Sequence, residues 1–426
     1  MEILSDPTPD MLAMPRFDDG AIDMQELLRR LAEQVVNAVM DAEADQLCGG
    51  GANSRNGYRE RSLATCVGTL TLRIPKLRSG SFFPEDVLER YQRVDRALVA
   101  AVAEMYATGT STRKVQRVAE KMGVSRLSKD QVSAIASSLD ADIEDLCGRP
   151  LGGSPVPYVW LDETYVKCRR EGRVASTAVV IAIGCDAGGW RRVLGVDVVD
   201  TESYDSWLAF PRAILSRGAA GVRLVVSDAH PGLVRALGEV FQGAAWQRCA
   251  VHLMRDCMRE AGSWQLRRRV GRIVSQVFRG RDAATVTAMY HAACDMLAGC
   301  CPRAAAVLEE AEPDALAYLD FPPAHWKRLR TNNVQERTNR EIKRRSRVVQ
   351  VFPSTGSLVR LAGAVMCEQD EIWQESRYFS EARMNELYDD GRTRGIDGTV
   401  DWARLEAEAR KMLESGLELA DRIETA

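Results

Sequence analysis

The sequence predicts an α/β protein: a mixed sheet with helices on its faces, an all-helical block inserted into the sheet domain, and a mainly helical region before it. Three observations predict this architecture. Short apolar runs between residues 155 and 250 alternate with helix-like patterns. From 251 to 328 no further strand pattern occurs. Before a Gly- and Pro-rich joint at 148–155, most apolar residues recur at helical spacing.

The totals exclude several classes of protein. A chain of 426 residues is long enough for roughly two to four domains. The net charge of -3 excludes a general polycation, so any nucleic-acid surface must come from local clusters of basic residues. No apolar run approaches the ~20 residues of a membrane span, and the N-terminus is acidic without an apolar leader. We therefore expect a cytoplasmic protein with no membrane partner and with its eleven cysteines reduced.

The region 21–150 is predicted to be mainly helical. Residues 1–20 show no periodicity and predict a disordered tail. Apolar residues from Ile22 to Met40 predict an amphipathic helix, which either packs on its own domain or forms a dimer contact. Alternation in 68–78 predicts a strand that stops at Pro75. The basic residues of this strand are equally compatible with a solvated face and with phosphate contacts.

Residues 110–146 predict a helix-turn-helix. Thr110–Thr112 can cap one helix, and the capping-box pattern beginning at Ser128 opens a second, which we expect to continue through Glu144. The first helix supplies the basic side chains Arg113, Lys114 and Arg117. Helix pairs also occur in domains that touch no DNA. We expect this region to bind DNA and to contribute to dimerisation.

The strands and helices after the joint follow a recognisable order. Strands are predicted at 158–161, 177–183, 193–199, 224–227 and 245–247, with helices at 204–215 and 232–240. The ribonuclease H-like fold has this order. We expect the first part of a catalytic domain at 155–250, the all-helical insertion at 251–328, the return of the catalytic domain at 329–375 and a helical C-terminal tail at 376–426.

Three acidic residues stand at the borders of predicted elements. Asp162 follows the apolar strand 158–161, Asp228 follows the run 224–227, and Glu336 lies near the start of a basic helix. Two divalent cations ~3.5–4 Å apart can catalyse phosphoryl transfer on nucleic acid, and Mg²⁺ prefers oxygen ligands such as these carboxylates. Each acid taken alone is equally compatible with a surface carboxylate.

A stripe of charge runs along the helix that carries Glu336. Arg340, Lys343 and Arg347 follow it at spacings that place all four on one side of a helix, and Arg344 adds to the positive charge. A solvated helix face more often mixes the two signs. The stripe therefore predicts contact with DNA phosphates, with binding that weakens steeply as salt rises.

Cys249 and His252 form a Cys-x-x-His pair. Two ligands are only half of a zinc site, and the sequence offers no obvious fourth ligand, so we expect no zinc here. The pair is predicted either to fix the start of the helical insertion or to help position DNA.

Five separated motifs resemble the mutator-type transposases of bacterial insertion sequences, a family of DDE transposases. Three of these stretches, 160–167, 226–233 and 336–345, contain the acidic residues, and 246–252 contains the Cys-x-x-His pair; the N-terminal stretches 74–78 and 110–115 match as well. The resemblance implies a ribonuclease H-like catalytic core and assigns Asp162, Asp228 and Glu336 as catalytic metal ligands. It also implies cleavage at terminal inverted repeats and strand transfer by 3′-hydroxyl attack.

The expected cofactor is a pair of Mg²⁺ ions, with Mn²⁺ as a substitute. The expected partners are double-stranded DNA, both terminal repeats and target, and a second copy of the chain in a homodimer. That DNA would place the protein at the nucleoid. Two alternatives remain: a non-catalytic helix-turn-helix regulator and a ribonuclease H-like nuclease. The chain departs from the resemblance in Glu163, an extra carboxylate, and in the absence of an apolar run at 333–335.

Overall fold

The computed structural model describes the chain in eight segments: 14–49, 54–80, 82–84, 94–124, 127–170, 172–200, 203–389 and 400–425. Most of the tail expected at 1–20 lies outside these residues. Contacts divide the chain into two compact units, Met1–Ala141 and Asp142–Ala426. Each unit is described by itself.

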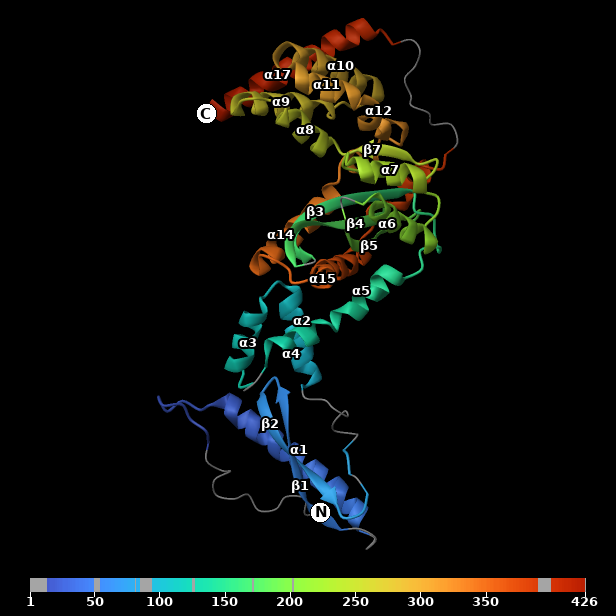
Figure 1. Ribbon diagram of the computed structural model, residues 1–426. Helices are drawn as coiled ribbons and strands as arrows, with labels where there is room; N and C mark the ends of the chain where they lie inside the picture. Colours follow the sequence, from blue (N-terminus) through green and yellow to red (C-terminus); the bar gives the residue numbers. More distant parts are fainter. Residues whose placement is uncertain are drawn as a thin grey trace. The chain divides into compact units, whose positions relative to one another are not determined.

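In the first unit a long helix packs on a two-stranded hairpin (Figure 1). Helix α1 spans Met24–Cys48, and the strands are β1 (Arg55–Thr65) and β2 (Gly68–Leu77). Their shared core contains Met40, Ala44, Leu63, Leu70, Leu72, Ile74 and Phe82. Side chains of α1 pair with the outer edge of β2: Glu33 accepts from the Thr71 amide, and Asn37 donates to the Thr71 carbonyl and accepts from the Arg73 amide.

The hairpin corrects the sequence prediction in two ways. Strand β1 was not predicted, and β2 continues through Pro75 to Leu77. β1 carries no apolar alternation because most of it is solvent-exposed, and it is held by pairing with β2 rather than by burial. Pro75 is tolerated because it pairs beside a register shift in β1, at Tyr58.

Helices α2 (Arg96–Ala107), α3 (Thr112–Lys121) and α4 (Lys129–Ala136) surround a second small core. The predicted caps form, since the Ser111 side chain accepts from the Lys114 amide and Ser128 forms a capping box. The helix expected to run on through Glu144 is instead two helices. α4 ends at Ala136, and α5 (Leu139–Gly148) follows.

The second unit is built on a five-stranded mixed sheet of order β5-β4-β3-β6-β7. The strands are β3 (Tyr158–Arg170), β4 (Arg173–Cys185), β5 (Arg191–Val199), β6 (Leu224–Ser227) and β7 (Ala245–Arg248). The first three pair antiparallel, whereas β6 runs parallel to β3 and β7 parallel to β6. The predicted mixed sheet is therefore confirmed.

Helices cover both faces of this sheet (Figure 1). Val159 and Leu161 of β3 pack in one core with α6 (Tyr204–Ser216) and α7 (Pro231–Val240). Tyr158 and Trp160, which alternate with them, pack in the other core with α14 (Asn333–Val349) and α15 (Thr355–Gln374).

A block of helices separates β7 from α14 and contains no strand within the described residues. It comprises α8 (Ala250–Arg259), α9 (Trp264–Val277), α10 (Ala283–Cys300), α11 (Pro302–Glu310), α12 (Glu312–Ala315), the 3-10 turn η2 (Ala317–Asp320) and α13 (Trp326–Leu329). After α16 (Glu381–Glu386), the C-terminal helix α17 (Trp402–Thr425) returns to this block and packs on α9 and α10, burying Ala409 and Leu413 (Figure 1). None of the described helices is both long and apolar enough to cross a membrane.

Candidate active site

Asp162 lies in the middle of β3, not at its end as the sequence predicted. The strand continues to Arg170 because β4 pairs with it along its whole length. Its parallel pairing with β6, however, stops at Trp160 opposite Val226. Asp162 therefore lies just beyond the point where β6 ends, and it is only 6% exposed.

Asp228 follows β6 directly and lies near Asp162. Burial first, and then the charge of Asp228, raise the pKa of Asp162 to about 6, although His252 and Asn339 act in the opposite direction. Ser227, at the end of β6, is fixed by a hydrogen bond from the Trp246 indole at 2.9 Å. The buried Asp162 carboxylate thus lies beside a second, partly exposed carboxylate at the end of a parallel strand.

Buried amides attach the start of α14 to β3. Asn332 donates to the Leu161 carbonyl at 2.9 Å, and Gln335 donates to the carbonyls of Trp160 and Ile181, each at 3.0 Å. One turn further on, Asn339 donates to Oδ2 of Asp162 at 2.6 Å. Glu336 lies between these anchors, on the turn of α14 that they attach to β3.

The Glu336 side chain itself is engaged elsewhere. Its Oε1 accepts from Arg255 of α8 at 3.3 Å, and the side chain is 34% exposed. Within the described parts of the chain, no three His, Cys, Asp or Glu side chains are grouped so that they could hold a metal ion. The structure therefore brings Asp162 and Asp228 together and places Glu336 on the adjoining helix turn, paired with arginine.

The chemical type of the predicted ligands suits a hard divalent cation. All three predicted ligands are carboxylates, and the mutual repulsion of Asp162 and Asp228 is what a bound cation would relieve. Glu163 adds a buried Oε2 with no hydrogen-bond partner. Burial first, and then Asp162 and Asp228, raise the pKa of Glu163 to about 8.

Cys249 and His252 lie where the helical insertion begins. The Cys249 sulfur accepts from the Asn332 amide at 3.3 Å, and the Ala250 amide donates to the Arg330 carbonyl at 2.9 Å. These bonds join the start of the insertion to its end, beside α14. Burial opposes a charged His252, but Cys249, Asp228 and Asp162 outweigh it and raise the pKa of His252 to about 9.

The predicted DNA-contacting side chains are exposed. On α14 these are Arg340, Lys343, Arg344 and Arg347, and on α3, in the other unit, they are Arg113, Lys114 and Arg117. Arg344 is paired with Glu341 at 2.6 Å, so the stripe is not purely positive. Their neighbour Arg345 is buried and pairs with Glu368.

Comparison with known proteins decides the family. The sequence profile described as Transposase, Mutator family, matches residues 10–376. The chain belongs to the Mutator family of transposases. It is 42% identical over 364 residues to the transposase for insertion sequence element IS1081 of Mycobacterium tuberculosis, covering 83% of this chain and 87% of the relative.

Other relatives in the Mutator family agree with this assignment. The transposase for insertion sequence element ISRM5 of Rhizobium meliloti is 39% identical, with 84% of this chain and 90% of the relative covered. The transposase for insertion sequence element IS256 in transposon Tn4001 of Staphylococcus aureus is 36% identical, with 75% and 82% covered.

The buried amides of α14 were not predicted as site residues in this Mutator-family chain. Asn332, Gln335 and Asn339 are spaced i, i+3 and i+7, so they share one side of the helix, and all three are buried. A row of amides on the inner side of a helix was the available signal. The prediction for this helix was based instead on its basic residues.

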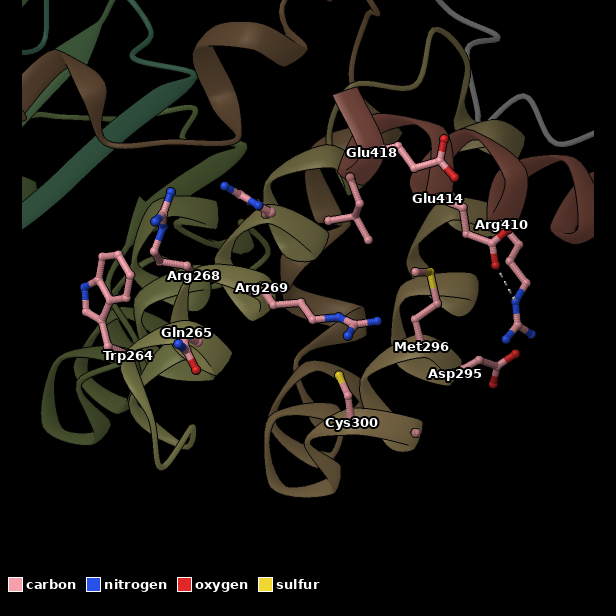
Figure 2. A pocket seen from close by; sticks show the side chains of 13 residues that line it. Trp264, Gln265, Arg268, Arg269, Asp295, Met296, Cys300, Arg410, Glu414 and Glu418 are labelled. Carbon is pink, nitrogen blue, oxygen red and sulfur yellow. Dashed lines mark ion pairs between the residues drawn. The ribbon is translucent and has the colours of Figure 1, made fainter. Parts of the chain in front are cut away.

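A cavity of about 840 Å³ lies in the helical insertion, away from the carboxylates (Figure 2). α9, α10 and α17 line it, with Arg269 extending between the helices toward Met296. None of Asp162, Asp228 and Glu336 lines this cavity. This hollow is therefore separate from the predicted site on the sheet.

Proposed function

We propose that this chain cuts DNA at transposon terminal inverted repeats and joins the freed 3′-hydroxyl to another strand, as a DDE transposase. The observation that carries the proposal is the buried Asp162 with Asp228 beside it, next to the helix turn that carries Glu336. The relatives, which are named transposases of insertion sequences, support the same reading.

Asp162, Asp228 and Glu336 would hold two Mg²⁺ ions, with Mn²⁺ as a substitute. Such a pair activates the attacking oxygen and stabilises the leaving oxygen in an in-line displacement. For Glu336 to serve as a ligand, its carboxylate must release Arg255. Because this ion pair is partly exposed to solvent, breaking it costs little free energy.

The chain's own residues orient this site. Asn339 holds Oδ2 of Asp162 in place by a hydrogen bond. Gln335 hydrogen-bonds to both β3 and β4, which fixes the start of α14 and therefore the backbone position of Glu336. Beyond it, Arg340, Lys343, Arg344 and Arg347 would contact the phosphates of the bound strand.

The remaining regions would deliver the DNA. We propose that the core is ribonuclease H-like, since its three antiparallel strands followed by two parallel ones fit that order. The α3–α4 pair would contact the repeats through Arg113, Lys114 and Arg117. Because two transposon ends must meet, we also propose a homodimer. The DNA substrate would keep the protein at the nucleoid.

Mg²⁺-dependent nicking of a duplex that carries the element's own terminal repeat tests the proposal. Wild type should nick the repeat end and join it to a target, whereas Asp162→Ala should bind the same duplex without cutting it. Preferential cutting of RNA–DNA hybrid would favour the nuclease. Binding without cutting by both proteins would favour the regulator.

A further inference from the structure

Strands β3 and β4 extend beyond the rest of the sheet as a two-stranded arm. β6 pairs with β3 only over 158–160, and β5 pairs with β4 only from Ala178 onward. The pairs from Val166 and Thr177 to Arg170 and Arg173 therefore have no further strand beside them. We call residues 165–170 and 173–177 the arm.

One side of the arm is held against the protein. Val166 and Cys168 are buried, and the backbone of Phe352, between α14 and α15, bonds to the free edge of β3. The Phe352 amide donates to the Lys167 carbonyl at 2.9 Å, and the Arg169 amide donates to the Phe352 carbonyl at 2.8 Å. These contacts fix the arm next to α14, so it is a rigid extension.

The other side of the arm faces solvent and is basic. Tyr165, Lys167 and Arg169 alternate with the buried residues and are all exposed; we call them the arm face. Neither Lys167 nor Arg169 forms an ion pair with a described residue, whereas Arg170 is paired with Asp200 at 3.1 Å. No acidic residue occurs among the described residues of the arm.

The arm face begins two residues beyond Glu163 on the same side of β3, whereas Asp162 lies on the opposite side with Val166 and Cys168. The Glu163 carboxylate is close enough to Asp162 and Asp228 for their charges to raise its pKa. At ~3.4 Å per residue, Tyr165 is about 10 Å along the strand from Asp162, and Lys167 and Arg169 follow at steps of about 7 Å. Lys167 and Arg169 form no ion pair with a described residue, and their spacing is comparable to that of successive backbone phosphates. They therefore fit a polyanion that runs along this side of β3 toward Glu163. An aromatic ring between them and the site can pack on a sugar or a base.

We propose that the arm face binds the sugar–phosphate backbone of the DNA that lies at the carboxylates. Lys167 and Arg169 each contact a phosphate, and Tyr165 packs on the same strand nearer to Asp162. The inference rests on the proposed function for the identity of the DNA. It adds a contact surface distinct from the α14 stripe and from α3.

The test compares two double variants of the full chain. Lys167→Ala with Arg169→Ala removes the two cations of the arm face. Arg279→Ala with Arg281→Ala removes two equally exposed arginines, also without ion pairs to described residues, from the loop between α9 and α10. The dissociation constant for a terminal-repeat duplex is measured over a series of KCl concentrations.

Loss of two phosphate contacts should make the slope of log affinity against log salt shallower by about 1.8. The control pair should leave the slope unchanged, and the charge-keeping pair Lys167→Arg with Arg169→Lys should restore it. An unchanged slope in the alanine pair, or an equal change in the control pair, overturns the inference while leaving the proposed function intact. Wild type that binds no duplex refutes the proposed function, and the inference with it.

Discussion

Asp162→Asn should make the metal-free protein more stable at neutral pH while abolishing its proposed chemistry. The reason is that the native fold forces a carboxylate into a buried position beside Asp228. An asparagine there keeps the volume and can still accept the hydrogen bond from Asn339, but it carries no charge to desolvate.

The pKa shift sets the size and the pH window of this effect. The pKa of Asp162 is raised from 3.8 to about 6. Below pH 3.8 both folded and unfolded states hold the proton, so the charge costs nothing. Between 3.8 and 6 only the folded state holds it, so stability falls as the pH rises, and above 6 the loss is complete. Two pKa units at ~1.36 kcal/mol each correspond to about 3 kcal/mol.

Denaturant unfolding of the full chain in EDTA, at pH 4.5 and at pH 7.5, measures this difference. The variant should exceed wild type by up to about 3 kcal/mol at pH 7.5, with a much smaller gap at pH 4.5. Asp370→Asn is the matched control, because Asp370 is also buried but accepts from Arg149 and from the Val193 amide, each at 2.6 Å. That change should instead cost about 3 kcal/mol or more.

The reasoning is refuted if Asp162→Asn is less stable than wild type at pH 7.5, or if its advantage does not change with pH. Added Mg²⁺ supplies a second comparison. It should stabilise wild type more than the variant, because only wild type gains a bound cation at this position.

Three further predictions concern other parts of the chain. Arg255→Gln releases Glu336 from its ion pair, so the Mg²⁺ concentration for half-maximal cleavage should fall. The free energy of unfolding should change by less than about 1 kcal/mol. A higher Mg²⁺ requirement would contradict this. Leu31→Lys with Val35→Lys places charges in the exposed apolar row of α1 and should convert a dimer to a monomer in light scattering, and an unchanged mass would show that α1 is not the contact. Gly189→Ala should cost about 2–5 kcal/mol in denaturant unfolding, because its φ is +83° and the new Cβ would clash with the Phe379 carbonyl oxygen. Gly243→Ala, at φ +84° with no atom of a described residue nearby, should cost only about 1–2 kcal/mol.

The sheet was predictable because its strands are buried on both faces. Runs such as 224–226 are continuously apolar, and turn residues separate them from amphipathic helices. In the hairpin of the first unit, β2 was predicted from the sequence but β1 was not, for the opposite reason. β1 is mostly exposed and carries charge, so its strand character comes from pairing with β2, which no local pattern records.

The three acidic residues could be identified from the sequence, but their structural surroundings could not be predicted. The end of β3 was misplaced because the length of a strand depends on its partner: β4 extends it to Arg170, while β6 ends opposite Trp160. The pairing of Glu336 with Arg255 joins positions 81 residues apart, and so it required the fold. The roles of Asn332 and Asn339 also depend on which side of α14 meets the sheet.

The central claim is that Asp162, Asp228 and Glu336 form one catalytic metal site. The most direct measurement is cleavage and strand transfer on the terminal repeats that flank the gene, in Mg²⁺ or Mn²⁺, comparing wild type with Asp228→Ala. Wild type should nick and join the repeat only when metal is present, and Asp228→Ala should lose both activities while still binding the repeat. Cleavage by Asp228→Ala at the wild-type rate would contradict the account.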